Sequence, residues 1–243
     1  MTKADRAEQS EASQIEKKME SLRRAIAYAA REQGTDPDEN LWLRCAIDRA
    51  EREQLKDEAI ERAIRRGAGE TDDPPLELAT FEGYGPEDVA VFVRSITESP
   101  KRTREELDEL FREFGGNVGE DGCVAWQFDS RGVVRVRSSS VDDVDTFELQ
   151  IIEAGGQDLG EPLFGDEDDR ASVYRVFTDP SDVLQVAEAL DDAGYEVHDV
   201  SWEQEPTQHV ELDRDEARQF HSFKRTLTER PDVQDVFANW KRA

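Results

Sequence analysis

FEGYGPEDVAVFV, residues Phe81 to Val93, joins two runs with strand character through a short segment rich in glycine. Residues 76–83 and 89–97 carry the apolar and β-branched side chains that strands favour, and Gly83-Tyr84-Gly85-Pro86 between them has turn composition. In a second interpretation the segment is a binding site, where Tyr84 stacks on a base. Either way, this stretch predicts a β-hairpin and the start of a sheet.

Before this hairpin the apolar residues recur at helical spacing. They predict helices over residues 14–32, 38–54 and 56–66, with Gly67 just beyond the last helical residue. Short connections favour a small three-helix bundle over residues 1–70. The segment GAGETDDPP, residues 67–75, has the composition of a linker to the sheet.

After the hairpin, Thr103 and Glu106 have the spacing of a capping box and predict the start of a helix. Alternating side chains predict a strand over Val124–Phe128. Asp129-Ser130-Arg131-Gly132 has turn composition, so we expect the chain to reverse there.

From Val133 the predicted elements follow the order strand, helix, strand, strand, helix, strand, which is typical of a ferredoxin-like unit. The elements that follow this unit need a sheet to join. We therefore predict an α+β fold in which residues 132–205 form a ferredoxin-like domain inserted into a second ferredoxin-like α/β domain made of residues 76–131 plus 206–243. The strand expected at 207–212 should pair into the sheet of the second domain.

The composition is strongly acidic. The 243 residues include 58 Asp and Glu against 31 Lys and Arg, for a formal charge of −27, and arginine outnumbers lysine by 24 to 7. Such a surface is typical of a halophilic protein, because salt at about 1 M shortens the Debye length to about 3 Å and screens self-repulsion. An ordinary acidic protein is the alternative interpretation.

No apolar run approaches the length of a membrane span and the N-terminus has no apolar signal core, so the sequence predicts a cytoplasmic protein that does not contact membranes. Cys45 and Cys123 are far apart in the sequence, and the three histidines are isolated. Because the sequence contains no recognisable catalytic or metal-binding motif, we expect no enzyme activity, no cofactor and no metal.

The charge is unevenly distributed along the chain. Residues 1–69 carry a net charge of −1, whereas the remaining residues carry −26. A surface that binds a polyanion would need a segment without strong negative charge, and residues 1–69 are such a segment. The alternative explanation is that the helices of this segment carry mixed charges in i,i+4 pairs. The candidate nucleic-acid-binding residues are the basic ones of the first and third helices, Lys17, Lys18, Arg23, Arg24, Arg62, Arg65 and Arg66.

Several stretches resemble the YebC/PmpR family over residues 40–240. They are LKDEAIERAIRRGAGE (Leu55–Glu70), FEGYGPEDVAVFVRSITES (Phe81–Ser99), GGNVGEDGCVAWQFDSRGVV (Gly115–Val134) and TDPSDVLQVAEALDDAGYEV. The resemblance implies three domains, with the third inserted in the second, and a role as a transcriptional regulator that binds DNA or as a translational activator at the ribosome. The opening MTKADRAEQSEAS lacks the lysine-rich start usual in the family.

Together these observations predict a non-enzymatic regulator of gene expression, acting as a monomer on DNA or on ribosomal RNA. The basic face would contact the nucleic acid, with Tyr84 considered for stacking. The alternative is an acidic protein-interaction adaptor without direct nucleic-acid binding. A hydrolase is a more distant alternative, because no carboxylate is singled out by a companion His, Ser or Cys.

Overall fold

The computed structural model describes residues 3–163 and 172–243, and its contacts divide the chain into two compact units. The first unit contains residues 1–35, 50–129 and 206–243, and the second contains residues 36–49 and 130–205. Residues 1–2 and 164–171, which fall inside the predicted domains, lie outside the described part. The α+β class and the insertion of one unit into the other agree with the predicted fold.

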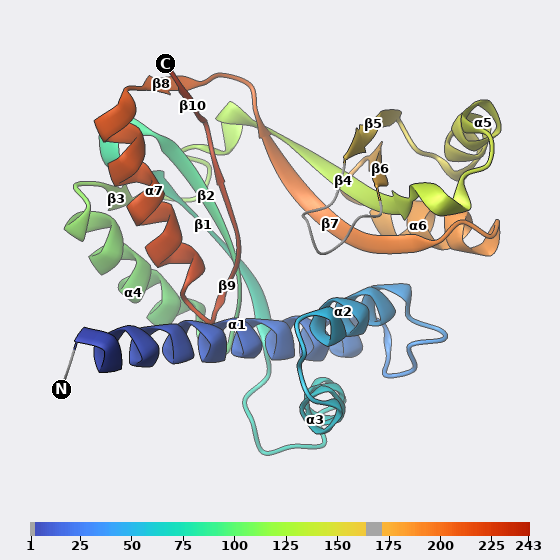
Figure 1. The fold of residues 1–243 in the computed structure, drawn as a ribbon, viewed down its shortest axis with the longest axis horizontal. Coiled ribbons are helices and arrows are strands. Elements are labelled where there is room, and N and C mark those ends of the chain that lie inside the picture. The colour runs from blue at the N-terminus through green and yellow to red at the C-terminus, as the bar shows by residue number, and fades with distance from the viewer. Residues whose placement is uncertain (1–2, 164–171) are drawn as a thin grey trace. The chain divides into compact units, whose positions relative to one another are not determined.

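The first unit is built on a four-stranded sheet of order β3-β1-β2-β9 (Figure 1). Its central strand β2, Ala90–Thr97, is buried along nearly its whole length because helices cover one face and a loop covers the other. The other elements of this unit are α1 (Lys3–Gln33), α3 (Asp57–Gly67), β1 (Glu77–Tyr84), α4 (Pro100–Glu113), β3 (Asn117–Val118), β8 (Val210–Leu212), α7 (Arg214–Thr228), β9 (Val233–Ala238) and β10 (Trp240–Arg242).

The core of the first unit lies between the sheet and the helices α4 and α7. Phe111 of α4 meets Phe223 of α7 edge to face, with ring centroids 4.9 Å apart. Asp213 precedes α7 as its N-cap, and its carboxylate caps the helix in a capping box with Glu216. Helix α1 packs against α3 and against the strands β2 and β9.

The second unit contains the sheet of order β5-β6-β4-β7, which is the strand order of a ferredoxin-like fold. Its elements are β4 (Phe128–Arg137), α5 (Val144–Ala154), β5 (Asp158–Leu163), β6 (Val173–Thr178), α6 (Val183–Asp192) and β7 (Val197–Pro206). Helix α2, Leu41–Arg52, contributes Leu41 and Cys45 to the core of this unit. The contacts of α2 and α1 therefore differ: α1 packs on α3 and the first sheet, whereas Leu41 and Cys45 pack in the second unit.

The first sheet corrects one predicted pairing. The strand β8 does not join β1 and β2, but pairs in parallel with β10, so that Val210 faces Trp240. It is β9 that extends the sheet, pairing antiparallel with β2. The C-terminal segment thus returns to the first sheet as expected, but through β9 and not through β8.

The hairpin between β1 and β2 forms where predicted, but its glycines have a different role. The left-handed residues are Glu87 and Asp88, with φ of 59° and 55°. Gly83 and Gly85 instead permit close packing, since a Cβ on Gly83 would lie 2.4 Å from the carbonyl oxygen of Asn117. A Cβ on Gly85 would lie 2.7 Å from the ring of Phe223.

Three local predictions were wrong. Helix α4 begins earlier than Thr103, because Ser99 is the N-cap and accepts a hydrogen bond from the Arg102 amide. The predicted strand at residues 124–128 is a short 3-10 helix, Ala125–Gln127. The predicted turn at residues 129–132 is part of the long strand β4, because pairing with β6 and β7 overrides its turn composition.

Candidate nucleic-acid interface

Helix α3 carries three of the candidate arginines and is amphipathic. Ile60 and Ala63 are buried, and a Cβ on Gly67 would lie 2.3 Å from the Ala27 carbonyl oxygen of α1. Gly67 is thus the last helical residue, and its absent side chain, rather than a left-handed φ, lets the two helices approach. Acidic residues occupy the first turn and arginines the last, as the helix dipole favours.

Arg62 and Arg65, here called the exposed arginine pair, project into solvent from α3. The Arg62 side chain is 69% exposed, and its one ion pair with a described residue is a long contact of 3.7 Å to Asp73. Among the described residues, no carboxylate forms an ion pair with Arg65. These two guanidinium groups are available to an anionic partner.

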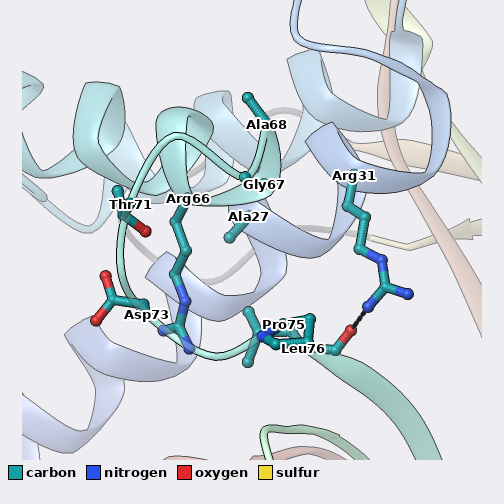
Figure 2. Close-up of a pocket in the computed structure, with 10 residues that line it drawn as sticks. Ala27, Arg31, Arg66, Gly67, Ala68, Thr71, Asp73, Pro75 and Leu76 are labelled. Atoms are coloured by element: carbon teal, nitrogen blue, oxygen red, sulfur yellow. Dashed lines mark hydrogen bonds between the residues drawn. The ribbon is translucent and has the colours of Figure 1, made fainter.

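Arg66 does not share that face. Its side chain is only 14% exposed and reaches Glu98 at 2.6 Å. It also donates a hydrogen bond of 3.1 Å to the carbonyl of Pro74. Figure 2 shows Arg66 running from α3 toward Asp73 and Pro75 of the linker. The predicted basic triplet is therefore divided between solvent and the interior.

Arg24 of α1 is buried at the same place. Its guanidinium lies 3.2 Å from Asp232 and 3.7 Å from Glu98. Arg24, Arg66, Glu98 and Asp232, here called the buried ion cluster, tie α1 and α3 to residues at the ends of the strands β2 and β9. Buried charges need such partners, because removing ions from water is costly.

Hydroxyl groups and a third arginine complete the environment of Asp232. Thr103 donates to its carboxylate at 2.8 Å and Arg102 at 3.1 Å. Burial favours the neutral acid, but the Thr103 hydrogen bond and the charge of Arg24 outweigh burial and lower the pKa of Asp232. Thr103, predicted to cap a helix, instead holds this carboxylate.

The remaining candidates on α1 are mostly paired. Arg23 contacts Glu16 at 2.7 Å and Glu20 at 2.9 Å, and Lys18 contacts Glu53 at 2.5 Å. Lys17 is half-buried. Arg24 of α1 and Arg66 of α3 do come together, but they meet on the carboxylate of Glu98 and do not form a continuous basic surface. No local sequence pattern indicates these pairs, because Glu98 and Asp232 are far from both helices along the chain.

Tyr84 is half-buried, and its hydroxyl is engaged within the protein. Its hydroxyl donates to the Cys123 carbonyl and accepts from the Gln127 amide, each at 3.3 Å. Among the described aromatic side chains, Trp126 is highly exposed, at 65%. Its loop is fixed by the buried carboxylate of Glu82, which accepts three backbone hydrogen bonds of 2.8 Å.

The cysteines do not form a reactive or metal-binding site. Burial raises the pKa of the Cys45 thiol to about 12, so it behaves as a small apolar core residue. In the part of the chain that the structure describes, no three His, Cys, Asp or Glu side chains gather to hold a metal ion. Over the same residues, no helix has the length and apolar character needed to cross a membrane.

The geometry defines an α+β protein with a ferredoxin-like insertion, whose N-terminal helices expose two arginines beside a buried ion cluster. Residues 2–70 match the TACO1/YebC protein N-terminal domain, and residues 76–240 match the TACO1/YebC second and third domain. The chain belongs to the TACO1/YebC family.

Relatives of known sequence carry a regulatory name. A "Probable transcriptional regulatory protein" of Desulfatibacillum aliphaticivorans is 40% identical over 218 residues, covering 90% of this chain and 85% of that protein. A protein of the same name from Synechococcus is 41% identical over 223 residues, with the same coverage of both chains. A crystal structure of a conserved hypothetical protein from Aquifex aeolicus matches with a TM-score of 0.72 and 32% identity, covering 93% of this chain and 90% of that one.

Proposed function

We propose that this protein is a non-enzymatic regulator of gene expression that binds nucleic acid through the exposed arginine pair of α3. The observation that carries the proposal is the position of these two arginines. They project from a segment of nearly neutral net charge in a protein of charge −27. A polyanion approaches such a protein where the field permits it, and guanidinium groups bind phosphate bidentately.

The names of the relatives support a role in regulation, and DNA and RNA are both candidates for the ligand. High salt weakens the contribution of counterion release, so binding at the working salt would depend on shape and stacking as well as on charge. Trp126 is the aromatic side chain whose exposure suits stacking, and Tyr84 is not.

The test is a charge reversal that spares the buried ion cluster. We expect the double variant Arg62→Glu and Arg65→Glu to lose at least tenfold in affinity for single-stranded RNA or duplex DNA, measured by fluorescence anisotropy. Arg66 stays unchanged, because its contact with Glu98 makes it part of the fold.

The matched control is Arg218→Glu with Arg225→Glu on α7. Both side chains are exposed, at 68% and 71%, and each forms a local surface pair on α7 or at its end. The control changes the net charge by the same amount. Equal losses of affinity in the two double variants would mean that net charge alone matters, and the α3 surface would not be the interface.

A second candidate function is an acidic adaptor that binds a protein partner without contacting nucleic acid. The observation that favours it is that Arg23, Arg24, Arg66 and Lys18 are already paired within the chain, while Leu149 and Ile152 of α5 are 62% and 68% exposed. Exposed apolar side chains on an acidic surface suit a basic, partly apolar partner. If wild-type protein binds neither RNA nor DNA in the anisotropy measurement, the adaptor becomes the better assignment.

A further inference from the structure

A pocket of about 360 Å³ lies where the chain leaves α3 and wraps toward β1 (Figure 2). One water occupies about 30 Å³ in the liquid, so this space can hold a group much larger than a single water. Its polar walls come from α1, from the end of α3 and from the linker, and they include Arg31, Arg66, Thr71 and Asp73.

Two polar atoms in this wall are buried without a hydrogen-bond partner among the described residues, the Nε of Arg66 and the Oγ1 of Thr71. Figure 2 shows the Thr71 hydroxyl turned toward the Arg66 side chain. An arginine Nε–H can only donate, and a threonine hydroxyl can donate as well. Buried donors are almost always satisfied in folded proteins, so the missing partner is an acceptor.

The charges of the pocket select the kind of acceptor. Arg31 and Arg66 both line it, and each uses part of its guanidinium within the chain. Arg31 donates to the carbonyl of Leu76, whereas Arg66 contacts Glu98 and Pro74. The one lining carboxylate, Asp73, has Arg62 at 3.7 Å. The pocket thus combines two cations, a free hydroxyl and one carboxylate that already faces a cation.

We propose that this pocket binds a phosphate group. Phosphate offers several acceptor oxygens to arginine donors and a hydroxyl, and it pairs with guanidinium groups in bidentate geometry. The volume also leaves room for the sugar or other group to which the phosphate is attached. Arg62, part of the exposed arginine pair, contacts Asp73 of the same pocket, so an extended anion could contact both.

The phosphate can come from two sources. One is a nucleic-acid backbone or end, and this source rests on the proposed function. The other is a small phosphorylated ligand, and this source stands without it. The binding chemistry is the same in both cases, so the experiment separates the sources by competition.

The test is a titration of the full-length protein with inorganic phosphate at constant ionic strength, observed through the backbone amide NMR signals of Gly69 and Thr71. We expect saturable shifts in the wild-type protein, and at least threefold weaker binding in Thr71→Val, which removes the hydroxyl but keeps the shape. The matched control Thr226→Val removes a half-buried hydroxyl of α7 and should bind phosphate as the wild-type protein does. Arg66→Lys keeps the charge beside Glu98 but has no Nε–H, so it should also weaken binding.

Shifts that do not saturate, or equal binding by Thr71→Val and Thr226→Val, would overturn the proposal and leave the pocket to water. A second arm adds a short oligoribonucleotide to the phosphate-bound protein. Displacement of phosphate supports the nucleic-acid source, and retention of phosphate supports a small phosphorylated ligand. Phosphate binding that survives the Arg62 and Arg65 charge reversal, while RNA binding is absent in every variant, would refute the proposed function and keep the pocket.

Discussion

Arg65 and Arg66 are neighbours in the sequence, yet the first belongs to a solvent-exposed basic surface and the second to a cluster of paired charges. Arg65 is exposed and makes no ion pair among the described residues, whereas Arg66 lies against Glu98 in the buried ion cluster. One step along a helix turns a side chain by about 100°, so adjacent residues can face solvent and the interior. Net charge by segment therefore overstates the basic surface that a partner can reach.

The same contrast holds on α1. Arg23 and Arg24 are also neighbours, but among the described residues Arg23 pairs only with carboxylates of its own helix. Arg24 reaches Asp232, more than two hundred residues later in the sequence. The difference separates cations that pair within their own helix from cations that join distant segments of the chain. Substitutions at Arg24 and at the exposed arginine pair test it.

The largest expected effect is at Arg24. Replacing it by Met keeps the aliphatic volume but removes the charge that faces Asp232 and Glu98. Removing one partner of a buried pair typically costs about 3–5 kcal/mol, so we expect the free energy of unfolding to fall by about that amount in denaturant titrations. Arg23→Met is the matched control and should cost less than about 1 kcal/mol, because its pairs are local and partly exposed.

The pH dependence gives this prediction a second check. The lowered pKa of Asp232 means that its stabilising contribution is present above the unfolded pKa of about 3.9 and is lost as the pH falls through the folded value. The difference between Arg24→Met and the wild-type protein should therefore shrink as the pH is lowered from 7 toward 3. A difference that stays constant over this range would show that lost packing, and not charge, is responsible.

These contacts also show which features of the fold could be predicted from the sequence and which could not. The periodicity from Val133 onward predicted the ferredoxin-like order, because the helices α5 and α6 and the strands β4, β6 and β7 place buried side chains at regular spacing. The residues that bind Arg24 were not predictable in this way. Glu98 follows β2 and Asp232 precedes β9, and only the pairing of these two strands brings the carboxylates together.

Glycines show the same limit. Gly67 was predicted as a helix stop from its residue type, yet it is needed because α1 lies against it. Gly83 and Gly85 were predicted as turn residues, and they too are sites of close approach. A glycine signals that something is close or that φ is positive, and the sequence alone does not distinguish the two.

A smaller effect is expected at Gly67, where α3 lies against α1. Alanine in place of glycine within a helix normally stabilises it by about 0.5–1 kcal/mol. Here the new Cβ would lie 2.3 Å from the Ala27 carbonyl oxygen and 2.7 Å from the Ala30 Cβ. We expect Gly67→Ala to destabilise the protein by about 1–3 kcal/mol instead, measured by chemical denaturation. A stabilised variant would contradict the close contact of α1 and α3.

The smallest expected effect is at the exposed arginine pair. Replacing Arg62 and Arg65 together by Ala should change the free energy of unfolding by no more than about 0.5 kcal/mol at 1 M KCl, because neither side chain packs against the core. At low salt the loss of two positive charges leaves the repulsion among the carboxylates less balanced, so the variant should be slightly less stable than the wild-type protein. This deficit should vanish as salt shortens the Debye length to about 3 Å. A loss above about 1 kcal/mol at 1 M KCl would place these arginines among the structural cations. The distinction between the exposed arginine pair and the buried ion cluster would then fail, and with it the reason for assigning the pair to a partner.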